Sequence, residues 1–129
     1  MYFRIEEHIL ITRADLRAHR HKIFLFGDNL IGRGLGGQAR EMRGEPNAIG
    51  IPTKRLPSMI PDAFFTDQDF EKNVAAIDCA FDRILPLPRG TTIVLPSNGL
   101  GTGRAEMKTR APKTFAYLNS KLRELRDLP

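Results

Sequence analysis

The sequence predicts an α/β fold, a layered α/β/α sandwich in which helices cover both faces of a mostly parallel or mixed central sheet. Two observations support this class. Short apolar or β-branched runs suited to strands alternate along the 129 residues with segments of helical periodicity. The run at residues 23–26 is apolar throughout, which is typical of a parallel strand buried on both faces. We therefore expect one domain over residues 1–129.

The first third of the chain is expected to hold a strand, a helix and a second strand. Residues 2–6 have the composition of a short edge strand. Thr12 is a good N-cap residue for a superficial helix from Arg13 to about His19. The apolar run at residues 23–26 follows, and we expect it to be the central strand.

A glycine-rich loop over residues 27–37 comes next. Its five glycines favour backbone conformations and close approaches that other residues do not permit. A short helix is expected to begin there, over residues 38–42. Residues 48–51 have the composition of another strand, which Pro46 and Pro52 are expected to terminate.

The second half of the chain alternates in the same way. Thr66 is a suitable N-cap for a helix over residues 67–85, where apolar residues recur at helical spacing. The same periodicity places Cys79 in a helix, and we expect it to pack in the core. Residues 91–95 are expected to form a β-branched strand, and an amphipathic helix is expected over residues 112–126.

Composition limits the classes of function. The net charge of +5 favours an anionic partner, and it suits a nucleotide or a nucleic acid equally. The longest apolar run is far too short to cross a bilayer, so we expect no membrane partner. The acidic N-terminus is unlike a signal peptide and the single cysteine cannot form an intramolecular disulfide, so a cytoplasmic location is expected.

Two strand–loop–helix units carry the functional signal. Glycines after a strand let backbone N–H groups converge on a phosphate, and neighbouring parallel strands bring such loops to one edge of the sheet. The loops at 27–37 and 97–103 meet this requirement, although glycines also serve ordinary turns. The predicted ligand-binding residues are Gly27, Arg33, Gly34, Gly36, Gly37, Ser97, Asn98, Gly99, Leu100, Gly101, Thr102, Gly103 and Arg104. The stretch GRGLGG fits neither a dinucleotide fingerprint in register nor a P-loop, which argues against a kinase or a P-loop ATPase.

Two polar side chains directly after the central strand are candidate catalytic residues. Asp28 could bind ribose hydroxyls or act as a base, or it could form an Asx-turn. Asn29 could contact ribose or position a water molecule, and it also tolerates a left-handed turn. Among the basic residues near the loops, Arg33 and Arg104 are favoured for phosphate over Lys54 and Arg55 because glycines flank them.

Two blocks of the chain resemble segments of the macro-domain family. The run FLFGDNLIGRGLGGQAREM resembles the family's strand, Asn and glycine-rich loop, and IVLPSNGLGTGRAEMKTRAPKTFAYLNSKL resembles its second loop and closing helix. The resemblance implies a macro-domain-like fold that binds ADP-ribose. It would place Asn29 near the distal ribose, residues 34–37 near that ribose and the phosphates, and residues 97–103 around the diphosphate. The family's early Gly-Asp-Ile-Thr motif is absent, since the region reads ILITRADL.

We therefore expect a binder of ADP-ribose or a related NAD-derived nucleotide, with or without hydrolysis by a water near Asp28 and Asn29. A phosphoribohydrolase of nucleoside monophosphates is one alternative, because LPSNGLGTGRAEM is faintly similar to that class's loop ending in Glu, here Glu106. A basic nucleic-acid-binding module is the other, although the chain has no evident aromatic stacking array. No cofactor is expected, and the histidines show no metal-binding spacing. The oligomeric state is left open.

Overall fold

Four parallel strands form the sheet of the computed structural model, which describes residues 1–129. The strands lie in the order β1-β4-β2-β3. Their bounds are Arg4–His8 for β1, Ile23–Asn29 for β2, Ala48–Lys54 for β3 and Thr92–Pro96 for β4. The predicted α/β class and parallel sheet are confirmed, with β1 at an edge and β2 inside the sheet.

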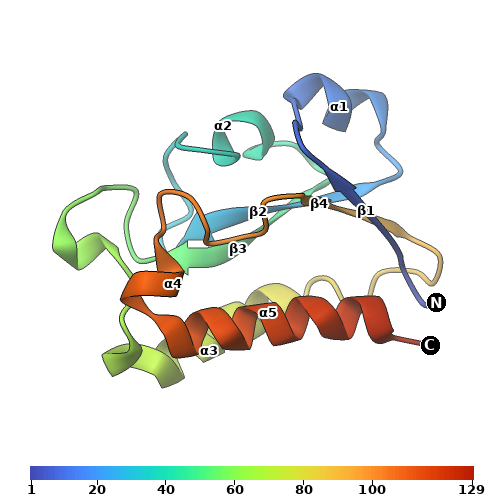
Figure 1. Ribbon diagram of the computed structural model, residues 1–129. Coiled ribbons are helices and arrows are strands. Elements are labelled where there is room, and N and C mark those ends of the chain that lie inside the picture. Colours follow the sequence, from blue (N-terminus) through green and yellow to red (C-terminus); the bar gives the residue numbers. More distant parts are fainter.

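Helices lie on both faces of this sheet (Figure 1). One face carries α1 (Arg13–Ala18) and α2 (Ala39–Met42), and the other carries α3 (Phe70–Phe81) and α5 (Pro112–Asp127). The short α4 (Met107–Arg110) leads into α5, and two 3₁₀ turns, η1 (Pro61–Ala63) and η2 (Asp67–Asp69), precede α3. The arrangement is the layered one that the sequence predicts.

Strand β2 contributes to an apolar core on each face. Leu25 belongs to the larger cluster, beneath α3 and α5, whereas Phe24 and Phe26 belong to the smaller one with α1 and α2. Successive side chains of a strand point to opposite faces, so an apolar run is what a strand covered on both sides requires. This explains why residues 23–26 show no polar alternation.

The predicted helix over residues 67–85 is shorter than expected. It opens as the 3₁₀ turn η2, and α3 ends at Phe81. Thr66 makes no side-chain capping bond. Instead the carboxylate of Asp67 accepts hydrogen bonds of 2.9 and 3.0 Å from the N–H groups of Lys113 and Thr114. An aspartate that the sequence placed in the first turn of one helix thus caps another, α5.

Two further expectations are wrong. Pro52 was expected to terminate the third strand, but β3 continues through it to Lys54. This is permitted because β3 lies at the edge of the sheet and pairs only with β2. Cys79 is exposed, since Ile77 and Phe81 take the buried positions of α3. By contrast, the Thr12 cap is confirmed as part of a capping box at the start of α1.

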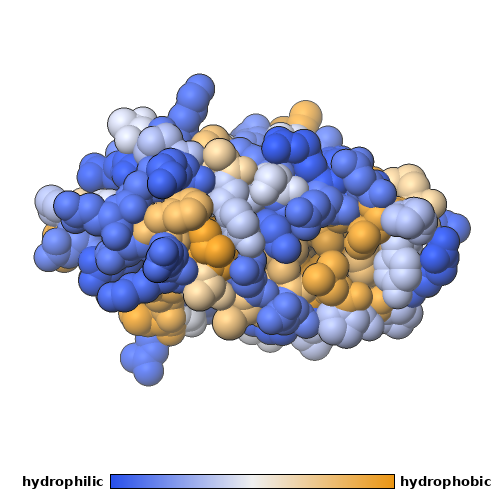
Figure 2. Space-filling model, turned by 90° about the horizontal axis from the view of Figure 1, so that it is seen from below, coloured by the Kyte–Doolittle hydropathy of each residue, from blue (hydrophilic) through white to orange (hydrophobic).

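The face that carries α3 and α5 is largely hydrophilic, with apolar areas between the polar side chains (Figure 2). None of the helices combines the length and the apolar character needed to span a bilayer. The candidate functional site lies elsewhere, at the carboxyl edge of the sheet, where the two glycine loops leave β2 and β4.

Candidate functional site

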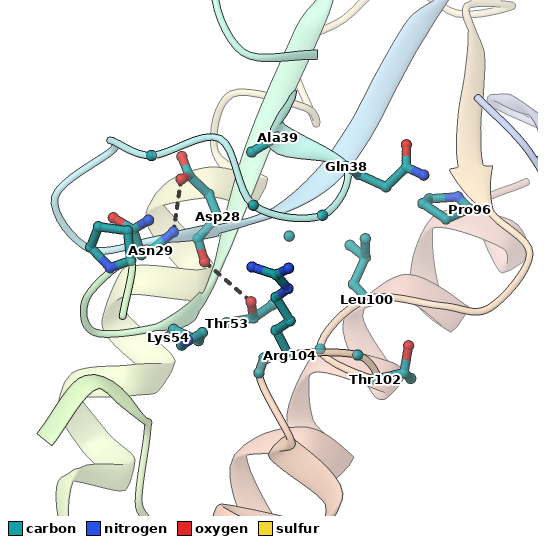
Figure 3. A pocket seen from close by; sticks show the side chains of 18 of the residues that line it. Asp28, Asn29, Gln38, Ala39, Thr53, Lys54, Pro96, Leu100, Thr102 and Arg104 are labelled. Carbon is teal, nitrogen blue, oxygen red and sulfur yellow. Dashed lines mark hydrogen bonds between the residues drawn. The ribbon is translucent and has the colours of Figure 1, made fainter. Parts of the chain in front are cut away.

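A cleft of about 410 Å³ lies between the two glycine loops at the carboxyl ends of β2 and β4 (Figure 3). These strands pair directly, with Phe24 opposite Val94. The loops therefore leave the sheet side by side, as the sequence predicts. A cleft of this volume is in the range that holds a small organic ligand.

The cleft brings together nearly all the predicted site residues. Those that line it are Gly27, Asp28, Asn29, Arg33, Gly34, Gly36, Gly37, Asn98, Gly99, Leu100, Gly101, Thr102, Gly103 and Arg104. Ser97 does not line it, because its N–H extends the β1–β4 pairing by donating to the carbonyl of His8. Lys54 lines the cleft although the sequence favoured it less, whereas Arg55 does not.

The second loop presents backbone donors that the protein leaves unpaired. The N–H groups of Leu100, Gly101, Thr102 and Gly103 have no acceptor within the chain. Leu100 is 2% exposed and Gly101 is buried. A methyl group placed on Gly27 would lie 3.9 Å from the Gly101 nitrogen, so this nitrogen faces the end of β2. Buried N–H groups almost always have a partner, and converging ones suit an anion.

Asn29 organises the first loop from within. Its Nδ2 donates to the carbonyl of Arg33 over 2.6 Å, and its Oδ1 accepts from the N–H of Ile31 over 3.1 Å. These bonds close a turn that starts the glycine-rich stretch, and Gly34 and Gly37 then adopt positive φ angles. The Asn29 amide thus has local partners, and its catalytic role stays a prediction.

Asp28 is bound by a residue that the sequence analysis did not identify. The Arg43 guanidinium, just beyond α2, pairs with the Asp28 carboxylate and also donates through Nε to the carbonyl of Gly34 over 2.8 Å. Arg43 therefore joins β2 to the first loop. The only signal in the sequence was a basic residue after the short helix, which does not reveal a contact 15 residues back.

Three cations at the cleft have no carboxylate within ion-pair distance: Arg33, Lys54 and Arg104. The Lys54 ammonium donates to the carbonyl of Ser58 and lies 4.6 Å from the centre of the Phe64 ring. Burial lowers the pKa of Lys54 below its ordinary value, and the positive charge of Arg104 lowers it further. The cleft is therefore an electropositive site that an anion would neutralise.

Arg104 reaches from the second loop toward the first. A methyl group placed on Gly36 would lie 3.3 Å from Nη1 of Arg104. Figure 3 shows the guanidinium between the loops, in the middle of the cleft. It makes no hydrogen bond in the protein, so its donors are free for a ligand held between the loops.

Comparison with known proteins identifies a family. The chain belongs to a family of unknown function (DUF7831), whose model matches residues 6–121. No curated protein and no solved structure matches the chain. The resemblance to macro domains therefore stays a prediction drawn from the two loop segments.

Proposed function

We propose that the cleft binds a phosphorylated nucleotide of the ADP-ribose class, with its phosphates on the second glycine loop. The observation that carries this proposal is the set of unpaired donors at residues 100–103, of which Leu100 and Gly101 are buried. The uncompensated charges of Arg104 and Lys54 lie at the same cleft. A phosphate would satisfy both the donors and the charges.

The size of the cleft favours a nucleotide over a free phosphate ion. It extends from Ile9, just after β1, to Met59, beyond β3. Both of these side chains are exposed, at 85% and 52%. A ligand that reaches from the phosphate loop to such apolar ends would bury them, which fits a nucleoside with its planar base and sugar. The ADP-ribose class comes from the resemblance of the loops to macro domains.

The proposal is one of binding, with hydrolysis as a separate question. A water activated near Asp28 would need a free lone pair on that carboxylate. Both of its oxygens accept hydrogen bonds from Arg43, and Oδ1 accepts another from the N–H of Asn29. Chromatography of ADP-ribose or its 1″-phosphate after incubation would detect any turnover.

The phosphoribohydrolase alternative receives no support from the geometry. Glu106, which would be its acidic residue, does not line the cleft and pairs with Arg110 over 3.0 Å. The nucleic-acid alternative predicts steep weakening of binding to a single-stranded oligonucleotide with added salt.

Calorimetric titration of the protein with ADP-ribose, AMP and ribose 5-phosphate tests the proposal. We expect saturable binding of ADP-ribose, at least tenfold weaker in Arg104→Glu because the new carboxylate repels phosphate. Arg83→Glu changes the net charge equally at an exposed residue outside the cleft, and it should bind as the wild type does. No heat from the wild type with any of the three ligands would contradict the proposal.

A further inference from the structure

Glu106 occupies a backbone conformation that side chains disfavour. It lies between the second glycine loop and α4, with a φ of 48° and a ψ of 36°. Every other residue of the chain with a positive φ is a glycine, and two of these, Gly99 and Gly101, belong to the loop just before it. A side chain in this left-handed conformation costs stability that a glycine would not. The outlier indicates that the carboxylate has a task in the structure.

The carboxylate of Glu106 holds Arg110, one helical turn further on. Its Oε1 accepts a hydrogen bond from Nε of Arg110 over 3.0 Å. The Arg110 guanidinium in turn lies over the ring of Phe64, with 3.6 Å between Cζ and the ring centre. Phe64 itself is buried. Glu106 thus orients a guanidinium that covers an aromatic ring beyond the end of β3.

The Phe64 ring carries a second cation, the Lys54 ammonium of the cleft. The two residues pair in an isolated antiparallel bridge, and Nζ of Lys54 lies 4.6 Å from the ring centre. Burial lowers the pKa of Lys54, and the positive charges of Arg104 and Arg110 lower it further. Among the groups that shift this pKa, Glu106 is the only one that raises it. Lys54 attracts an anion only while its amine is charged, so the carboxylate serves the cleft from outside it.

The other neighbours of Lys54 supply no negative charge that could replace this carboxylate. On β2 the residue opposite Lys54 is Asn29, which is uncharged. The Asp28 carboxylate, next to Asn29, is bound by Arg43. The Lys54 ammonium donates a hydrogen bond to the carbonyl of Ser58, which carries no net charge.

We infer that Glu106 is a positioning residue of the cleft: by pairing with Arg110 it balances the positive charge beside the Lys54 ammonium, which is then available to an anionic ligand. The inference rests on the proposed function and adds a residue that the ligand does not touch, because Glu106 does not line the cleft. This role differs from that of the acidic residue in the phosphoribohydrolase alternative, since it acts through Lys54.

Titration of Lys54 in the ligand-free protein, followed by NMR of isotope-labelled lysine, tests the inference without a nucleotide. The Lys54 signal is assigned by its absence in Lys54→Arg. We expect Glu106→Gln to lower the pKa of Lys54, because a negative charge is lost, and Arg110→Gln to raise it, because a positive charge is lost. An unchanged Lys54 titration in Glu106→Gln would overturn the inference.

Glu124→Gln is the matched control for this titration. Glu124 pairs with Lys121 over 3.4 Å on α5, so its loss removes the carboxylate of another exposed helical ion pair, and neither residue lines the cleft. The Lys54 titration should be the same in Glu124→Gln as in the wild type. An equal shift in Glu124→Gln and Glu106→Gln would show an effect of net charge alone and would likewise overturn the inference.

Thermal unfolding tests the premise that the Glu106 backbone is strained. Glu106→Gly and Glu106→Gln both lose the carboxylate, but only glycine adopts the left-handed conformation without steric cost. We therefore expect Glu106→Gly to unfold about 1–3 °C above Glu106→Gln. A Tm of Glu106→Gly at or below that of Glu106→Gln would remove the reason for assigning the side chain a task.

The pH dependence of ADP-ribose binding tests the role in the cleft. At pH 9 a larger fraction of Lys54 has lost its proton in Glu106→Gln than in the wild type. We expect the ratio of the Kd at pH 9 to the Kd at pH 7 to be about twofold larger in Glu106→Gln. In Lys54→Gln this ratio should be the smallest of the three. Equal ratios in wild type and Glu106→Gln would overturn the role in binding.

The outcomes separate this inference from the proposed function. Failure of the wild type to bind ADP-ribose at any pH would overturn the proposed function. The Lys54 titrations and the Tm values need no ligand, so they still decide whether Glu106 balances the charge beside Lys54.

Discussion

Arg43 binds the carboxylate of Asp28 through both of its terminal nitrogens, with Nη2–Oδ1 at 2.5 Å and Nη1–Oδ2 at 3.2 Å. The two side chains are only 20% and 15% exposed. A second set of bonds runs from the same guanidinium to the carbonyls of Arg33 and Gly34. One planar group thus fixes the end of β2 and the backbone of the first loop together.

Arg43→Lys should therefore destabilise the protein although it keeps the charge. An ammonium cannot reproduce the forked geometry, and we expect a loss of about 2 kcal/mol in the free energy of unfolding, measured by urea denaturation. Arg40→Lys is the control, since the Arg40 side chain is exposed and makes no hydrogen bond or ion pair. Equal stability of the two variants would contradict a positioning role for Arg43.

Because Gly50 has no side chain, there is room beside it for the side chain of Asp28. A methyl group on Gly50 would lie 2.6 Å from Oδ2 and 2.8 Å from Cβ of Asp28. We expect Gly50→Ala to cost about 1–3 kcal/mol of unfolding free energy, because the crowded carboxylate is held by Arg43 and cannot simply swing away. Gly103→Ala, whose methyl group would meet nothing within 4 Å, should change the stability by less than about 0.5 kcal/mol. An unchanged free energy of unfolding in Gly50→Ala would show that the Asp28 side chain can move to make room for the methyl group.

Gly101 must be glycine for two reasons, and Gly99 for only one. Both have positive φ angles, of 78° and 84°. A methyl group on Gly101 would also lie 2.3 Å from Sδ of Met107, which is fully buried, whereas one on Gly99 would meet only Thr102, at 3.6 Å. Gly101→Ala should therefore lose at least about 1 kcal/mol more stability than Gly99→Ala in chemical denaturation. Equal losses would mean that backbone strain alone matters.

Asp67 should make stability depend on pH through its cap on α5. Burial raises the pKa of Asp67, but the hydrogen bonds from the N–H groups of Lys113 and Thr114 outweigh it and lower the pKa below 3.8. Because the folded pKa lies below the unfolded one, the stabilisation is complete above about pH 5 and is lost as the pH falls through the folded pKa. Asp67→Ala should cost about 1 kcal/mol at pH 7 and progressively less below about pH 4.

The control for the pH dependence is Asp62→Ala. Asp62 is exposed, and its carboxylate makes no hydrogen bond or ion pair. Its removal should leave the unfolding free energy and its pH profile unchanged. A difference between wild type and Asp67→Ala that stays constant from pH 7 to pH 2 would contradict the capping explanation.

Local patterns in the sequence were sufficient to predict the elements that build the sheet and the helix of the C-terminal segment. Residues 23–26 are apolar without alternation, and only a strand covered on both faces buries such a run. The repeat of Phe115, Leu118, Leu122 and Leu125 predicted α5, which buries the three leucines and packs a partly buried Phe115 against the core. The sequence also showed glycines after two strands, and it predicted that the two loops would meet if those strands were parallel neighbours, as β2 and β4 are.

Only the tertiary structure decided which side chains line the cleft and which stabilise the fold. Arg43 reaches Asp28 across the first loop, and Asp67 caps α5 rather than α3, because the partners lie 15 and more than 40 residues away. No periodicity encodes such distances. The side-chain oxygen of Gln38 is buried without a hydrogen-bond partner, and this is likewise invisible in a sequence, because it depends on what surrounds the amide. The sequence determined where glycines leave the backbone conformationally free, and packing determined which N–H groups and side chains are left without partners.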